Sequence, residues 1–232
     1  MICLFDRYDQ ASFDLLRSLK ATGLDCPVVV QDDGYLSPDV ESPYSYFTGD
    51  LDTPEEKKSF HNIGYIYDYQ RLNNMNPEAL ILTNSDQLEQ IEQLLTQLPN
   101  VHFHIGAITE MSGHLMGFNR YPNVSLYPNI RPAKVAELFE RCDLYLDINI
   151  SDEILNACRT AFENNMLILS FTNTCHSHRF IADNHIYAPE NVSGMVGKIQ
   201  GVLSLPSEME AALAKQKQVA NQADLEAYKA IL

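Results

Sequence analysis

The segments Asp143-Leu-Tyr-Leu-Asp-Ile-Asn149 and Met166-Leu-Ile-Leu-Ser-Phe171 decide the fold class. Each is a short, nearly continuous apolar run, which is typical of a strand buried on both faces of a parallel sheet. Ser151 suits the N-cap of a helix between them, with Asp152 and Glu153 in its first turn. The inward face of that helix is marked by apolar residues at helical spacing, Ile154, Leu155, Cys158 and Phe162. The pattern therefore predicts one strand–helix–strand unit of an α/β sheet.

The same alternation continues in both directions along the chain. Upstream, the predicted strands are 79–83, 101–105 and 123–127. Asn84 or Ser85 is expected to begin a helix after the first of these strands, and Pro132 begins another that extends to Cys142. Downstream, the predictions are a short strand at 185–187, a helix at 191–203 and a closing helix after Pro206. Residues 77–232 are thus expected to form a Rossmann-like domain, with a parallel sheet and helices on both faces.

Residues 1–49 differ in character from the rest of the chain. They are predicted to hold a strand at 2–5, a helix from about 10 to 21 and a strand at 28–31. Such a βαβ-sized fragment is too small to bury both faces of its own sheet. The polar, proline-containing stretch that begins at Asp50 is typical of a linker, so residues 50–76 are expected to join the two parts.

Charge and cysteine content narrow the possible functions. The 31 acidic residues exceed the 16 basic ones, and the net charge of -15 repels polyanions, so nucleic acid is not expected as a partner. The five cysteines are widely spaced without a zinc-type pair, which is typical of reduced thiols in the cytosol. The first residues lack the pattern of a secretory signal, and no run reaches about 18 apolar residues. We therefore expect a cytoplasmic chain without direct membrane insertion.

Several long segments resemble one protein family. The order of the predicted elements is similar to that of the second domain of GT-B glycosyltransferases. In detail, the segments are similar to those of the GtfB family, the stabilising, non-catalytic subunit of the accessory Sec UDP-GlcNAc:peptide N-acetylglucosaminyltransferase of Gram-positive bacteria. They are Ala79-Leu-Ile-Leu-Thr-Asn-Ser-Asp-Gln87, His102-Phe-His-Ile-Gly-Ala107, Leu126-Tyr-Pro-Asn-Ile130, Asp143 to Asn149, and Asn164-Asn-Met-Leu-Ile-Leu169, with Asp32-Asp-Gly-Tyr-Leu36 and Ser42-Pro-Tyr-Ser-Tyr-Phe-Thr-Gly49 near the beginning.

The resemblance implies binding and stabilisation. Such a chain pairs with a catalytic glycosyltransferase subunit of the GtfA type and presents the serine-rich adhesin polypeptide that receives GlcNAc before export. It is expected in the cytoplasm, at the inner face of the membrane through its partners. Members of the family that it resembles are longer than this chain. Here Gly49 is followed almost directly by Asp52-Thr-Pro-Glu-Glu56, so the middle of the family chain is expected to be absent. The alternative function is that of a GT-B glycosyltransferase with a UDP-sugar donor.

The expected signals of a donor site are missing. GT-B donor sites place one carboxylate near the start of the helix after the fourth strand and another about eight residues later, and Thr160 stands where the second of these is expected. No G-x-G-x-x-G loop is present to hold a diphosphate. Gly106 follows the second strand, where a glycine either allows a ligand close to the backbone or forms a turn. These features favour binding over catalysis and predict no catalytic residue and no cofactor.

Polar residues after the predicted strands form the candidate ligand or acceptor pocket. His176, His178 and Arg179 follow the strand 166–171, at the carboxyl end where open α/β sheets bind ligands. Glu110, Asn149 and Glu153 lie at neighbouring strand ends. Helix capping and hydrogen bonds within loops explain the same residues equally well.

Two other groups of side chains are candidate sites. His102 and His104 alternate with Phe103 and so share one face of a strand, but no third metal ligand is evident from spacing, and no metal site is predicted. An aromatic group on either side of the junction is either a partner interface or part of a core. This candidate interface consists of Tyr44, Tyr46, Phe47, Tyr65 and Tyr67.

Overall fold

The computed structural model describes residues 69–222 and Tyr67 in full. In the N-terminal part it describes the backbone of four strands and residues 14, 15, 17, 18 and 21–23. The chain divides into two compact units, which are residues 1–67 with 221–232, and residues 68–220. Within the described ranges, no helix combines the length and the apolar character needed to cross a membrane.

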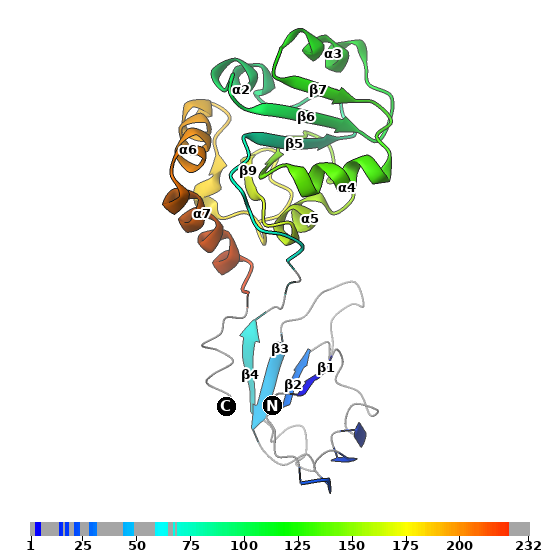
Figure 1. Ribbon diagram of the computed structural model, residues 1–232, viewed down its shortest axis with the longest axis vertical. Coiled ribbons are helices and arrows are strands. Elements are labelled where there is room, and N and C mark those ends of the chain that lie inside the picture. The colour runs from blue at the N-terminus through cyan, green and yellow to red at the C-terminus, as the bar shows by residue number, and fades with distance from the viewer. Residues whose placement is uncertain are drawn as a thin grey trace. The chain divides into compact units, whose positions relative to one another are not determined.

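The larger unit is built on a six-stranded sheet with the order β10-β9-β8-β5-β6-β7 (Figure 1). Every neighbouring pair is parallel, which confirms the predicted Rossmann-like α/β class. The strands are β5 (Glu78–Thr83), β6 (His102–Ala107), β7 (Val124–Tyr127), β8 (Leu144–Asp147), β9 (Leu167–Phe171) and β10 (Ile186–Tyr187). The helices are α2 (Ile91–Gln97), α3 (Gly113–Met116), η2 (Gly117–Arg120), α4 (Pro132–Arg141), α5 (Ala157–Glu163), η3 (Asp183–His185), α6 (Val192–Ser204) and α7 (Pro206–Val219).

The two faces of this sheet are covered by different helices (Figure 1). Alternate strand residues, such as Ile81 of β5 and Phe103 of β6, belong to a buried apolar cluster with side chains of α2, α6 and α7. The other face lies against α4 and α5, where the Phe139 and Tyr145 rings stack at 6.3 Å between centroids. The period of two along each strand therefore distributes the apolar side chains between two layers.

Two helices begin later than the sequence indicates. α2 begins at Ile91 after Gln90 in a left-handed conformation, so neither Asn84 nor Ser85 caps it. An antiparallel β-bridge between Leu88 and Asn149 holds the loop between β5 and α2 against the residues that follow β8. Likewise α5 begins at Ala157, which leaves Ser151, Asp152 and Glu153 in the preceding loop rather than at its N-terminus. The expected caps are wrong because these polar residues are used in loop contacts instead.

The N-terminal unit contains a sheet with the order β1-β2-β3-β4. Its strands are β1 (Cys3–Phe5), β2 (Val28–Gln31), β3 (Tyr44–Thr48) and β4 (Ser59–Gly64). The first pair is parallel and the other two are antiparallel. The expectation of a small βαβ fragment therefore missed two strands. One of them, β4, lies within the stretch that we expected to be a linker, so that description is wrong for residues 59–64.

The last part of the expected linker packs against the larger unit. Asp143, which precedes β8, is fully buried and pairs with the Arg71 guanidinium. Its carboxylate also accepts hydrogen bonds from the backbone N–H groups of Asn74 (2.9 Å) and Asn76 (2.6 Å). The Asn73 side chain donates to the backbone carbonyls of Asp143 and Asn165. A buried carboxylate needs such partners, and they fix residues 71–76 to the beginning of the sheet.

Candidate functional site

His176 and Asp147 form the centre of a polar network at the carboxyl ends of the strands. Asp147 ends β8 and is only 2% exposed. Its carboxylate contacts His176 Nδ1 at 2.5 Å and accepts the His176 backbone N–H at 2.8 Å. The other ring nitrogen of His176 lies 2.6 Å from the carbonyl oxygen of Ser151. The hydrogen bond to Asp147, followed by the attraction of its charge, raises the pKa of His176 to about 9 although burial opposes this. The imidazolium form donates through both nitrogens at neutral pH.

Asn149 belongs to the same network from the other side of the loop. Its Nδ2 donates to Asn84 Oδ1 and to the carbonyls of Ser151 and Asp152 at 3.1–3.2 Å. Its Oδ1 accepts the Thr83 hydroxyl at 2.8 Å. The side chain is 3% exposed. The side chains of Asn149 and His176 thus both bind the Ser151 carbonyl oxygen, and both hold the loop after β8 in place.

Two hydroxyl groups complete this network and were not predicted. Ser170 Oγ at the end of β9 and Thr174 Oγ1 both donate to the Asp147 carbonyl, at 2.7 and 2.8 Å. Asp147 was also missed, although an acid at the end of the apolar run 144–147 is a visible signal. The hydroxyls of Ser170 and Thr174 have no such signal, because these residues are common in loops and strands alike.

The remaining residues of the candidate pocket are more scattered. The Glu153 carboxylate accepts the Cys158 backbone N–H at 2.8 Å, so it acts on the first turn of α5 from outside the helix. Glu110 and His178 are exposed. The guanidinium of Arg179 lies over the Phe180 ring, 5.3 Å from its centroid. The structure therefore brings Asn149 and His176 together, with Glu153 in the adjoining loop.

The two residues used to judge a donor site have other roles. Thr160 lies inside α5, where its hydroxyl donates to the Asn156 carbonyl at 3.0 Å. It lines a cavity of about 540 Å³ with α4 and with residues that precede β5. Gly106 lies within β6, and a Cβ there would approach Ile130 Cδ1 to 2.8 Å. Side-chain packing therefore accounts for this glycine.

Exposed apolar side chains occur on the loops at the carboxyl ends of the strands. Ile108 directly follows β6 and is 42% exposed, and Ile150, in the loop after β8, is 44% exposed. Leu155, in the loop before α5, is 56% exposed and has a φ of 57°, which is unusual for a branched residue. Met116 of α3 is 45% exposed. These four residues, Ile108, Met116, Ile150 and Leu155, are called the edge residues below.

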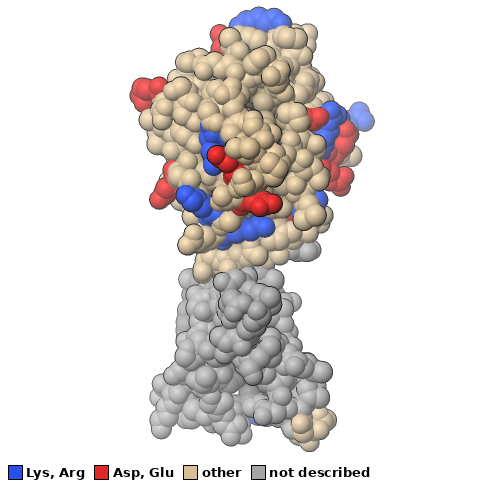
Figure 2. All heavy atoms as spheres, turned by 60° about the vertical axis from the view of Figure 1, so that its left-hand side comes forward, with Lys and Arg blue, Asp and Glu red and all other residues tan. Residues whose placement is uncertain are grey.

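The surface elsewhere on this unit is of mixed charge. Figure 2 shows one face, where basic and acidic side chains are interspersed among uncharged ones. A second cavity of about 450 Å³ lies between α7 and the segment that precedes β5, with Met75, Met209 and Leu213 in its walls. The Lys217 ammonium lies 4.5 Å from the centroid of the Tyr69 ring beside it. Both described cavities are therefore remote from the strand carboxyl ends.

The expected aromatic interface lies mostly outside the described side chains. Tyr44, Tyr46 and Phe47 belong to β3, of which the backbone is described. Tyr65 lies outside the described residues. Tyr67 is only 7% exposed. The choice between interface and core thus stays a hypothesis for this group.

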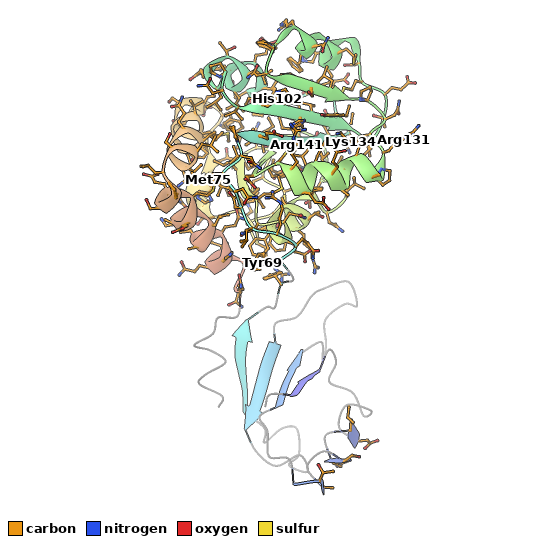
Figure 3. All side chains as sticks on the ribbon, viewed as in Figure 1. Tyr69, Met75, His102, Arg131, Lys134 and Arg141 are labelled. Carbon is orange, nitrogen blue, oxygen red and sulfur yellow. The ribbon has the colours of Figure 1, made fainter. Side chains whose placement is uncertain are left out.

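His102 and His104 share one face of β6, as the alternation predicts, with ring centroids 4.8 Å apart. His104 lies between Tyr127 OH, 2.9 Å from Nδ1, and Glu78 Oε2, 3.0 Å from Nε2. His102 Nε2 lies 2.8 Å from the Ser125 hydroxyl oxygen. Burial, above all, lowers the pKa of His104. Figure 3 labels His102 with Lys134 and Arg141, which lie along the side of the sheet that faces α4.

Comparisons with known proteins identify the family. A family model described as the GftB/GlyA-F C-terminal domain matches residues 79–216, and one described as the GtfB N-terminal domain matches residues 2–47. The chain is 46% identical over 181 residues to the UDP-N-acetylglucosamine--peptide N-acetylglucosaminyltransferase stabilizing protein GtfB of Streptococcus pneumoniae serotype 4, a match that covers 77% of this chain and 41% of the relative. It thus spans about two fifths of the length of this curated relative.

Two further comparisons connect the chain to known structures and enzymes. The crystal structure of a GtfA/B complex bound to UDP and GlcNAc matches with a TM-score of 0.70 and 31% identity, over 100% of this chain and 56% of that one. Glycosyltransferase GlyE of Streptococcus pneumoniae serotype 4 is 40% identical over 98 residues, which cover 42% of this chain and 24% of the relative. The parallel six-stranded sheet and these matches show that the chain belongs to the GtfB family, with a larger unit of the type found in the C-terminal domains of GT-B glycosyltransferases.

Proposed function

We propose that this chain is a non-catalytic subunit of a protein O-GlcNAc transferase, which stabilises a catalytic subunit of the GtfA type and binds the acceptor polypeptide. The acceptor would be a serine-rich adhesin that is glycosylated in the cytoplasm before accessory Sec export. Through its partners the complex would work at the inner face of the membrane.

The arrangement at the carboxyl ends of the strands carries this proposal. The polar groups that a nucleotide sugar would need there, Asp147, Asn149 and His176, are bonded to neighbouring protein groups. The edge residues instead offer apolar area, which suits contact with a polypeptide. The names of the relatives support the non-catalytic assignment, because curated members of the family are called stabilizing proteins.

The role of this edge in acceptor binding is tested with a matched pair of exposed leucines. Leu155→Asn removes an edge residue, and its left-handed backbone suits asparagine. Leu205→Asn is the control, since Leu205 is 52% exposed but lies between α6 and α7. Burial of a leucine contributes about 1.5–3 kcal/mol, so Leu155→Asn should weaken binding of a labelled serine-rich polypeptide by about tenfold or more. Equal affinities for the two variants would contradict acceptor binding at this edge.

Stabilisation of the partner is tested by co-expression. A catalytic subunit of the GtfA type is produced with and without this chain, and its soluble yield and GlcNAc transfer to the polypeptide are measured. Both should rise in the presence of the chain, because a ligand that binds only the native partner shifts its folding equilibrium. Unchanged yield and transfer would contradict the stabilising role.

The second candidate function is that of a glycosyltransferase with a UDP-sugar donor, favoured by the 40% identity to GlyE. Calorimetric titration of the full chain with UDP-GlcNAc separates the two functions. Heat of binding at micromolar concentration would favour the enzyme, whereas no heat at millimolar concentration would favour the stabilising subunit.

A further inference from the structure

A buried group of three potential metal ligands lies on the side of the sheet that faces α4. Glu78 begins β5, His104 lies within β6, and Cys142 follows the last residue of α4. One ligand atom from each residue lies within 4.8 Å of the other two. Cys142 is fully buried, and the side chains of His104 and Glu78 are 2% and 19% exposed. Three elements far apart in the sequence thus present sulfur, nitrogen and oxygen to one small volume.

We propose that Glu78, His104 and Cys142 bind one zinc ion that joins the C-terminal end of α4 to β5 and β6. Thiolate, imidazole and carboxylate are all ligands that zinc takes in tetrahedral sites, and a water molecule fills the fourth position. With metal–ligand distances of about 2.0–2.3 Å, tetrahedral ligand atoms lie about 3.3–3.8 Å apart. Glu78 Oε2 and His104 Nε2 already lie 3.0 Å apart, so the approach of about 1 Å that coordination requires is between these two groups and the Cys142 sulfur.

The hydrogen bonds around the three ligands favour coordination. Tyr127 OH lies 2.9 Å from His104 Nδ1 and can accept its proton, so that Nε2, which lies 3.0 Å from Glu78 Oε2, can turn its lone pair to the metal. Arg141 holds both oxygens of the Glu78 carboxylate, because Nη2 donates to Oε1 at 2.8 Å and Nε pairs with Oε2, which also lies 3.0 Å from His104 Nε2. Metal-binding histidines and carboxylates are usually held by such outer partners. His102 is not a ligand in this arrangement, because its Nε2 faces Ser125.

Binding exchanges a proton for the metal. Neutral His104 keeps one ring proton, which moves from Nε2 to Nδ1 by exchange with solvent, so the imidazole undergoes no net change. The Cys142 thiol loses its proton to solvent as the sulfur–zinc bond forms, and no oxidation or reduction takes place. One proton is therefore released for each zinc ion bound.

Cobalt(II) substitution of the full chain tests the site, because a thiolate ligand gives Co²⁺ a charge-transfer absorption in the near ultraviolet. We expect this band to saturate at one Co²⁺ per chain and to disappear when zinc is added. Cys142→Ser should abolish the band, and Tyr127→Phe, which removes only an outer partner, should weaken Co²⁺ binding about 10–100-fold. His102→Asn is the control and should leave both the band and the affinity unchanged.

Two results would overturn the proposal. One is the absence of a saturable charge-transfer band from the wild-type chain, a measurement that does not depend on the folding of any variant. The other is a band that persists in Cys142→Ser, which would assign the thiolate to another cysteine. Glu78→Gln provides a second ligand variant, expected to retain the band with affinity lowered by at least about tenfold. Circular dichroism of each variant confirms that the fold is kept.

Discussion

His176 in its charged form holds two loops together at the carboxyl ends of the strands, so the stability of the fold should fall at alkaline pH. Its ring donates to Asp147 and to the Ser151 carbonyl, and these contacts raise its pKa from 6.5 to about 9. A group whose pKa is higher in the folded state contributes its full stabilisation below the unfolded value. For His176, that contribution is complete below about pH 6.5 and is lost as the pH rises through 9.

The size of the loss follows from the pKa and the exposure of the ring. A change of pKa from 6.5 to about 9 corresponds to at most about 3.4 kcal/mol. The His176 side chain is 17% exposed, so solvent screens part of its interaction with Asp147. We therefore expect His176 to account for a loss of about 2–3 kcal/mol in the free energy of unfolding between about pH 6 and pH 9.5.

Urea unfolding at the two pH values measures this contribution. The wild-type chain is compared with His176→Gln, and the control is His178→Gln, which changes an exposed histidine two residues away. The difference between the two pH values should be smaller by about 2–3 kcal/mol in His176→Gln than in the wild type and the control. If all three proteins lose the same free energy to within about 0.5 kcal/mol, the charged contact between the loops does not stabilise the fold.

Three further predictions concern buried groups of the larger unit. Asp143→Ala leaves the Arg71 guanidinium without its buried partner and should lower the free energy of unfolding by about 3–5 kcal/mol in a urea titration; a loss below about 1 kcal/mol would contradict the role of this pair. Gly106→Ala should cost about 1–2 kcal/mol through contact with Ile130, and adding Ile130→Val should recover part of it in the same assay, whereas an unchanged midpoint for Gly106→Ala would show that the strand has room. His185 is buried, neither ring nitrogen has a partner among the described residues, and burial lowers its pKa to about 4, so wild-type stability should fall as the pH drops from 6.5 to 4. His185→Leu should be more stable by about 1–3 kcal/mol and should lose this acid dependence, and a destabilised variant would contradict the reasoning.

The strands of the larger unit could be predicted because their signal is local. Runs such as 144–147 and 167–171 are apolar except for one residue near their ends, and each is buried on both faces in the structure. The helix beginnings were less predictable. Leu155 and Asn156 both adopt left-handed conformations before α5, and nothing in their own side chains required this. The loop is shaped by Asn149 and His176, which meet its backbone from distant positions in the sequence.

The candidate site could be predicted only as a set of nearby strand ends. The parallel topology predicts only that its polar residues follow strands at one edge of the sheet. Their hydrogen-bonding partners depend on tertiary structure, so the sequence did not reveal that Asn149 and His176 serve the loop after β8. In the same way the face shared by His102 and His104 followed from alternation, whereas the approach of Glu78 and Cys142 required the packing of α4 on the sheet.

The attachment of residues 71–76 to Asp143 sets a practical limit for expression of the larger unit alone. A recombinant fragment that starts at Pro77, where the strand signal begins, would lack the Arg71 guanidinium and the N–H groups of Asn74 and Asn76 that meet this carboxylate. The buried Asp143 carboxylate beside the sheet would then lack these partners. A fragment that starts at Asp68 keeps these partners and is the better choice for crystallisation or NMR.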